Sequence, residues 1–354
     1  MLTRRELLSA AVALPASTLL DNRHFTQATS SAALPPRVAA AMAHVHSELR
    51  PALEGLMKTM GSFPPLTAET LSKQRQMMNG FARPVLPSPA VTERTIAGAP
   101  GAPSVRVFVA GNVAGASNPA VLHIHGGGYV MGSAGMSRRD IQELSTTHNC
   151  VAVSVDYRLA PETRFPGSLE DNYAALRWMH TNAKELGIDV KRIAIKGESA
   201  GGGHAAGLAI AARDRGEFPI CLQVLIYPML DDRTGATRAL PEQFGQFIWR
   251  ADDNRFGWTS LLGVPAGSAS VPANSVPARV SNLAGLPPAF ISVGSIDLFA
   301  PEDVEYGQRL MSAGVTTELH VVPGAFHGFD FFGETTLSRQ FAHAWNESLR
   351  RAFA

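Results

Sequence analysis

The stretch Ile193-Ala194-Ile195-Lys196-Gly197-Glu198-Ser199-Ala200-Gly201 joins an apolar run to a segment of small, helix-forming residues at 202–212. The spacing G-x-S-x-G at a strand-to-helix turn bends the chain so sharply that the serine oxygen projects above a sheet. The helix N-terminus beneath that oxygen favours developing negative charge. Taken alone, the pentapeptide also fits a serine that merely caps a helix. With a strand before it and a helix after it, the stretch predicts that Ser199 is a nucleophile.

Apolar runs that do not alternate with polar residues lie on both sides of this stretch. They cover 120–124, 151–155, 192–196, 221–227, 289–293 and 318–322. Such Val- and Ile-rich runs are typical of strands buried on both faces of a parallel sheet. Because helical segments separate most of them, we expect a doubly wound α/β sheet. Segments 92–97 and 105–110 alternate in polarity and predict two further strands, with a turn at 98–101.

Three consecutive glycines follow the predicted strand 120–124, in His125-Gly126-Gly127-Gly128-Tyr129. Each glycine costs about 1 kcal/mol relative to alanine in regular structure, which indicates backbone conformations or approaches that a side chain would forbid. Exposed amide N–H groups are the expected purpose. In acyl transfer, Gly127, Gly128 and Ala200 would donate them to the oxyanion of a tetrahedral intermediate. The alternative is a flexible loop.

A serine hydroxyl needs a base, usually histidine, to act as a nucleophile at neutral pH. His327 lies in a turn-like loop directly after the predicted strand 318–322, at the sheet edge where open α/β folds gather their sites. Asp297 occupies the corresponding loop after the previous strand and would orient the imidazole. We assign Glu302 and Asp303 to the start of the next helix, as favourable N-terminal charges. The order Ser199, Asp297, His327 is the order expected for this arrangement.

Several motifs resemble, in the right order, those of the bacterial hormone-sensitive-lipase-like carboxylesterase and lipase family. The similarity spans roughly residue 91 to the C-terminus. The motifs are His125-Gly126-Gly127-Gly128, Asp156-Tyr157-Arg158-Leu159-Ala160-Pro161-Glu162, Gly197-Glu198-Ser199-Ala200-Gly201-Gly202, Tyr227-Pro228, Leu286-Pro287-Pro288-Ala289 and His327-Gly328-Phe329.

This resemblance implies an α/β-hydrolase fold, with a mostly parallel central sheet flanked by helices and a helical cap. The core would comprise residues 91–230 and 286–354. The cap would combine two N-terminal helices within 34–90 with an insertion at 231–285, which is strand-poor and rich in Pro, Gly, Ser and Trp. The implied activity is hydrolysis of short- to medium-chain acyl esters, with chain length set by cap side chains such as Phe244, Phe247, Trp249 and Trp258.

The resemblance also implies supporting roles near the site. His125 would order the glycine loop instead of acting as a base, and Arg158 and Glu162 would hold structure. Glu198 departs from the aspartate that is most common in one large subgroup, and no proline follows Asp297 directly. These departures leave the expected mechanism unchanged and leave the subgroup and substrate open.

Composition limits the partners that we expect. Lys plus Arg number 31 and Asp plus Glu 30, so there is no basic field to attract nucleic acid. We expect a small, roughly neutral ester substrate, no cofactor and no metal, while a homodimer stays open. Cys150 and Cys221 adjoin predicted inner strands and are expected to be inert, buried thiols.

The N-terminus has the pattern of a signal segment. Thr3-Arg4-Arg5-Glu6-Leu7-Leu8 opens an apolar stretch at 7–20, and small residues follow at 28–33. This pattern resembles a twin-arginine export signal over residues 1–33. It predicts a periplasmic or secreted protein without a stable membrane span once the segment is removed. The alternative is a cytoplasmic protein with an amphiphilic N-terminal helix.

Three other functions fit parts of the sequence. An amidase or formamidase would use the same three residues on an amine leaving group. A ligand receptor on a hydrolase scaffold is a second alternative, because a fold does not determine a function. A metal pair at His123 and His125 is a third, and it would need further ligands in the fold.

Overall fold

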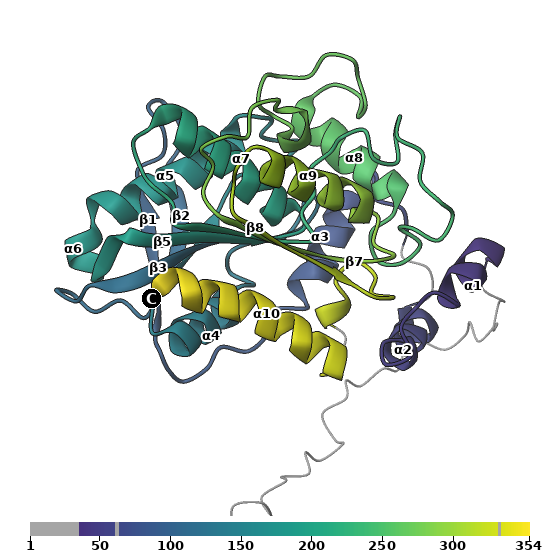
Figure 1. Cartoon of the computed structure of the whole chain (residues 1–354), viewed down its shortest axis with the longest axis horizontal. Coiled ribbons are helices and arrows are strands. Elements are labelled where there is room, and N and C mark those ends of the chain that lie inside the picture. Colours follow the sequence, from purple (N-terminus) through teal and green to yellow (C-terminus); the bar gives the residue numbers. More distant parts are fainter. Residues whose placement is uncertain (1–34, 61–63, 332–333) are drawn as a thin grey trace, which may run out of the picture. The chain divides into compact units, whose positions relative to one another are not determined.

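The computed structural model describes residues 35–60, 64–331 and 334–354. Residues Pro36–Ala354 form one compact unit (Figure 1). The predicted export signal, residues 1–33, lies outside the described residues. None of the helices in the described part combines the length and the apolar character that a bilayer span requires.

A single sheet organises this unit, and within the described residues it has eight strands in the order β1-β2-β4-β3-β5-β6-β7-β8. β2 pairs antiparallel with β1 and with β4, and the other pairs are parallel. The strands are β1 (Val91–Ile96), β2 (Val105–Ala110), β3 (Asn118–Ile124), β4 (Val151–Asp156), β5 (Ile188–Glu198), β6 (Leu222–Ile226), β7 (Ala289–Gly294) and β8 (Thr317–Val322). Every strand predicted from the sequence is confirmed.

Apolar packing covers both faces of the sheet. Val121 and Ala194 belong to one buried cluster, whereas their chain neighbours Leu122 and Ile195 belong to the other. Successive side chains of a strand point to opposite faces, so a strand covered on both sides must be apolar throughout. The helices α5 (Gly167–Thr181), α7 (Ala200–Arg215) and α9 (Ala300–Ser312) lie on one side, and α4 (Arg138–His148) and α10 (Thr336–Phe353) on the other (Figure 1). The short helix α6 (Ala183–Leu186) precedes β5.

The segment before β1 forms three helices in the described residues, where the sequence predicted two. They are α1 (Pro36–Met42), α2 (Arg50–Met60) and α3 (Leu71–Asn79). The first predicted helix is interrupted because Pro51 lacks a backbone N–H and fits only the first turn of a helix, so α2 starts anew there. In the interruption, the N–H of His46 donates to the carbonyl of Gly324 at 2.9 Å.

The segment 231–285 contains the helix α8 (Ala251–Leu262) and a 3-10 turn, η1 (Pro277–Arg279). A second 3-10 turn, η2 (Phe329–Phe331), follows His327. α8 ends at Gly263, whose φ of 72° is a left-handed conformation that favours glycine. The division of the chain into a core and a cap stays a prediction.

The two cysteines differ in exposure. Cys150 is buried and Cys221 is half-buried, so the expectation of two fully buried thiols was wrong for Cys221. Burial raises the pKa of the Cys150 thiol to about 12 and that of Cys221 to about 11. Both thiols are therefore protonated at neutral pH, and a protonated thiol is a poor nucleophile.

Candidate active site

Ser199 lies on a sharp turn between β5 and α7. Its φ of 57° and ψ of −122° fall outside the regions that residues with a side chain favour. Two hydrogen bonds hold this conformation: the Ser199 N–H donates to the carbonyl of Ile226 at 2.9 Å, and the Met229 N–H donates to the Ser199 carbonyl at 3.0 Å. A Cβ on Gly201 would lie closer than 3.0 Å to the carbonyl oxygen of Ile124. The turn therefore needs the glycine that follows Ser199 by two positions.

The structure brings together the three residues expected to act as nucleophile, base and acid. His327 Nε2 lies 2.9 Å from Ser199 Oγ, and His327 Nδ1 lies 2.8 Å from Asp297 Oδ2. The other Asp297 oxygen, Oδ1, accepts the N–H of Phe299 at 3.0 Å. Because the carboxylate accepts a hydrogen bond from the Nδ1–H group, the neutral imidazole leaves Nε2 free to accept the serine proton.

Aromatic rings enclose the imidazole. The Tyr227 and Phe299 rings contact it edge to face, with centroid distances of 4.8 and 5.1 Å. Ser199 is 8% exposed, His327 6% and Asp297 0%. Charge–charge and hydrogen-bond interactions in such a dry environment are stronger than in water.

The glycine loop passes beside the serine. A Cβ on Gly126 would lie 3.4 Å from the Ser199 Cβ. Gly127 and Gly128 have φ values of 124° and 60°, which residues with a side chain rarely adopt. The Gly127 carbonyl accepts the N–H of Met131 at 2.8 Å, which closes the loop on itself. The cost of the three glycines thus has a structural reason: Gly127 and Gly128 adopt positive φ, and a Cβ on Gly126 would lie 2.9 Å from the Glu198 carbonyl oxygen.

His125 is packed into this loop. Its ring stacks on Tyr157 with a centroid distance of 4.2 Å, and its Nδ1 lies 2.9 Å from the Gly126 carbonyl oxygen. Tyr157 donates its hydroxyl to the His125 carbonyl at 2.8 Å. Burial lowers the pKa of His125 to about 4, so its imidazole is neutral at neutral pH. This geometry fits a residue that orders the loop.

Glu198, next to Ser199, pairs with residues that sequence reasoning had not connected to it. Lys196 Nζ contacts Glu198 Oε1, and His123 Nε2 lies 3.0 Å from Glu198 Oε2. Burial alone would raise the pKa of Glu198, but Lys196 and His123 outweigh it and hold that pKa well below its ordinary range. The i, i+2 spacing of Lys196 and Glu198 on one strand places both side chains on the same face, and this was the available signal.

The described residues give no support to the alternative of a metal site at His123 and His125. His123 contacts Ser154 through Nδ1 as well as Glu198 through Nε2, and His125 is stacked in the loop. Among residues 35–60, 64–331 and 334–354, no group of three or more His, Cys, Asp or Glu side chains is arranged to hold a metal ion.

Arg158 and Glu162 make the kind of contacts that the resemblance implied. Arg158 donates to both carboxylate oxygens of Asp171 at 2.8 Å. Glu162 pairs with Arg75 of α3, which also donates to the carbonyl of Val130 at 2.7 Å. Arg75 thereby ties α3 to the chain that follows the glycine loop.

Glu302 and Asp303 lie in the first turn of α9, as expected, but they are not solvated charges. They are 1% and 0% exposed, and burial raises both pKa values well above their ordinary range. Glu302 Oε1 accepts the N–H groups of Leu230 and Asp231 at 2.7 and 3.1 Å. Burial therefore disfavours the charged forms that were expected, because the chain that follows β6 covers this helix start.

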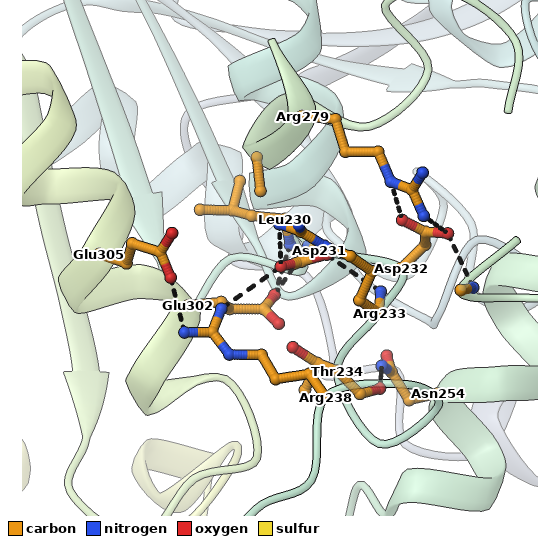
Figure 2. A network of polar contacts seen from close by, with 12 residues as sticks. Leu230, Asp231, Asp232, Arg233, Thr234, Arg238, Asn254, Arg279, Glu302 and Glu305 are labelled. Carbon is orange, nitrogen blue, oxygen red and sulfur yellow. Dashed lines mark hydrogen bonds and ion pairs between the residues drawn. The ribbon is translucent and has the colours of Figure 1, made fainter. Parts of the chain in front are cut away.

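A network of ion pairs surrounds Glu302 (Figure 2). Asp231 Oδ2 accepts from Arg238 at 3.4 Å, and Arg238 also pairs with Glu305 of α9 at 2.6 Å. Asp232 accepts two hydrogen bonds from Arg279, at 2.7 and 2.8 Å. Asp231 and Asp232 are both fully buried, and their charges require these partners. The network connects segment 231–285 to the first turns of α9. This helix begins three residues after Asp297.

The four aromatic residues expected to set the acyl chain length do not lie together at one place in the structure. Trp249 lies against Gly128, with its ring centroid 6.4 Å from that of His327. Phe247 contacts Phe326 with centroids 5.8 Å apart. Trp258 is fully buried and packs on Tyr129. Phe244 is partly buried against the same core cluster.

A sequence profile described as the α/β-hydrolase fold matches residues 121–331, which include the glycine loop, Ser199, Asp297 and His327. The chain belongs to this family. The carboxylesterase NlhH of Mycobacterium tuberculosis is 32% identical to this α/β-hydrolase over 295 residues, 79% of this chain and 89% of NlhH. The esterase LipI of the same organism is 35% identical over 269 residues, 72% of this chain and 80% of LipI.

Solved structures agree with these sequence matches. A bacterial heroin esterase has a TM-score of 0.78 and 34% identity, covering 88% of this chain and 99% of that chain. The expected α/β-hydrolase fold and the resemblance to bacterial hormone-sensitive-lipase-like carboxylesterases are confirmed. This α/β-hydrolase is a carboxylic ester hydrolase.

Proposed function

We propose that this α/β-hydrolase cleaves short- to medium-chain acyl esters through a Ser199–His327–Asp297 triad and an acyl-enzyme intermediate. The observation that carries the proposal is the continuous chain of short contacts, 2.9 Å from Ser199 Oγ to His327 Nε2 and 2.8 Å from His327 Nδ1 to Asp297. A nucleophile, a base and a residue that orients the base, in hydrogen-bond reach of one another, are the arrangement that acyl transfer requires.

In the first half of the reaction, Ser199 Oγ attacks the ester carbonyl carbon while its proton moves to His327 Nε2. The carbonyl oxygen becomes an oxyanion that accepts N–H groups from Gly127, Gly128 and Ala200. Collapse of this intermediate breaks the bond to the alcohol, and His327 gives its proton to the leaving alkoxide. Asp297 holds the imidazole and stabilises its positive charge throughout.

In the second half, a water molecule attacks the acyl-enzyme. His327 takes a proton from the water, the bond to Ser199 Oγ breaks, and the same proton returns to the serine oxygen. The products are the carboxylic acid and the free enzyme. The low exposure of Ser199 and His327 supports a limited substrate size, so we propose preference for p-nitrophenyl acetate to hexanoate over long chains. Faster turnover of a dodecanoyl ester would contradict this preference.

A fluorophosphonate probe tests the site assignment directly. Such a probe traps an activated serine, so we expect one adduct, located by peptide mapping on Ser199 and lost in Ser199→Ala. An adduct on another residue would overturn the proposal. Parallel assays on matched ester and anilide substrates separate an esterase from an amidase, and a purified enzyme that binds both without cleaving either would favour a receptor.

We also propose that residues 1–33 direct export to the periplasm or beyond. The paired Arg4 and Arg5 ahead of the apolar stretch support this proposal. Replacing both arginines by lysine should retain the esterase in the cytoplasm of a bacterial host, with the unmodified chain as control. Equal amounts of cytoplasmic enzyme from both chains would argue against export by this route.

A further inference from the structure

A strained turn directs one side chain of segment 231–285 toward the site. The N–H of Trp249 donates to the carbonyl of Phe247, two residues earlier, at 2.7 Å. The residue between them, Ile248, has a φ of 64°. This is a γ-turn of the rare, strained type, and a β-branched residue is among the least favourable at such a φ. Such strain persists only where the surrounding structure enforces it, and it often accompanies function.

The indole of Trp249 covers the glycine loop. A Cβ on Gly128 would lie closer than 3.0 Å to two ring carbons of Trp249, so the ring rests directly on that glycine. The indole is 7% exposed, and its centroid is 6.4 Å from that of His327. It therefore lies beside both the proposed oxyanion donor and the proposed base, where part of the ester must be placed.

Buried hydrogen bonds hold the indole in this position. Trp249 Nε1–H donates to Asn254 Oδ1 at 3.2 Å, and Asn254 Nδ2 donates to the Thr234 carbonyl at 2.9 Å. Asn254 is fully buried, and Figure 2 shows it beside Thr234 at the margin of the Asp231 and Glu302 network. A ring fixed by such a relay is part of the wall of the site, because moving it would leave buried polar groups unpaired.

We propose that Trp249 is a specificity-determining residue, which sets the largest ester that fits between Gly128 and His327. This inference rests on the proposed function and adds the side chain that limits substrate size. A smaller residue at position 249 opens space beside the reacting carbonyl. It should therefore accelerate reactions of large esters relative to small ones, while Ser199, His327 and Asp297 keep their contacts.

The experiment compares the full chain with Trp249→Ala, Trp249→Phe and the control Phe256→Ala. Phe256 is an aromatic residue of α8 that is partly buried against the core cluster. One substrate series varies the acyl group, p-nitrophenyl acetate against hexanoate and octanoate. A second varies the alcohol, ethyl acetate against benzyl acetate. The readout is the ratio of kcat/KM for the large and the small substrate, which is unaffected by the fraction of folded enzyme.

We expect Trp249→Ala to raise this ratio by about tenfold in at least one series, the lower end of the range for one methylene group in a hydrophobic pocket. Trp249→Phe keeps most of the ring, so its ratio should rise less, and this variant keeps the test valid if Trp249→Ala fails to fold. Phe256→Ala should leave the ratio unchanged.

Unchanged ratios in both series for both Trp249 variants would overturn the inference, as would an equal rise for Phe256→Ala. Fluorophosphonate labelling separates this failure from failure of the proposed function. If Ser199 is labelled in the full chain and the ratios do not change, the role of Trp249 is wrong and the triad stands. If Ser199 is not labelled, the proposed function itself fails.

Discussion

The two glycines that flank Ser199, Gly197 and Gly201, approach each other directly, because a Cβ on Gly197 would lie closer than 3.0 Å to the carbonyl oxygen of Gly201. The G-x-S-x-G spacing is therefore a packing requirement of the turn at Ser199. It follows from the contact of the last β5 residues with the first turn of α7.

Alanine at either position should destabilise the protein. We expect Gly197→Ala and Gly201→Ala each to lower the free energy of unfolding by about 3 kcal/mol, because backbone atoms must move to admit a methyl group. Gly207→Ala, on the same helix as Gly201, is the matched control. A Cβ there would meet only a Leu169 methyl group at 4.0 Å, so this variant should be neutral or stabilised by up to about 1 kcal/mol. Denaturant unfolding measures the free energy of unfolding of all three variants. If Gly207→Ala changes it as much as the other two, the close approach of Gly197 to Gly201 is unimportant for stability.

Substitution by asparagine should affect kcat very differently at Asp297 and at Asp303, although both side chains are fully buried. Asp297→Asn should lower kcat by about 10,000-fold, because the amide no longer favours the imidazole tautomer with its proton on Nδ1. Burial raises the pKa of Asp303 well above its ordinary range and so favours the uncharged carboxyl, which asparagine resembles in shape and charge. Asp303→Asn should retain activity within about tenfold. Steady-state kinetics with p-nitrophenyl acetate decides, and a larger loss for Asp303→Asn would transfer the acid role to Asp303.

Lys196 should be needed mainly because Glu198 is charged. Lys196→Met leaves this carboxylate largely buried with His123 as its remaining partner and should cost about 3 kcal/mol of unfolding free energy. The double variant Lys196→Met with Glu198→Gln removes the charge and should recover more than half of that loss. A double-mutant cycle by urea unfolding measures the coupling. Purely additive losses would mean that the two side chains do not stabilise each other.

His204 should make the stability depend on pH. It is buried between the edges of the Tyr129 and Tyr157 rings, and burial, helped by His125, lowers its pKa from 6.5 to about 3. Between these values the unfolded chain binds a proton and the folded chain does not, so stability falls as the pH drops below 6.5. His204→Phe should reduce this slope by about 1.4 kcal/mol per pH unit between pH 6 and 4. Urea unfolding at several pH values tests this, and parallel curves for both proteins would refute it.

Local patterns predicted the strands well because a strand buried on both faces must be apolar along its whole length. The convergence of the candidate site residues was predictable for a related reason. In a parallel sheet, the loops after successive strands meet at one edge, so Ser199, Asp297 and His327 were expected to converge there. The N-terminal helices were less predictable, since Pro51 interrupts a pattern whose apolar spacing continues through it.

The sequence alone is enough to derive the proposed chemistry: a bend that only glycines permit around Ser199, a glycine loop beside it, and a candidate acid and base at the ends of later strands. The tertiary structure decided which charges are neutralised and what surrounds the site. Burial raises the pKa of both Glu302 and Asp303, Glu198 is paired with Lys196, and Trp249 lies on Gly128. The physical reason is that burial and electrostatic environment are set by segments distant in sequence, whereas a bend or a strand is encoded by adjacent residues.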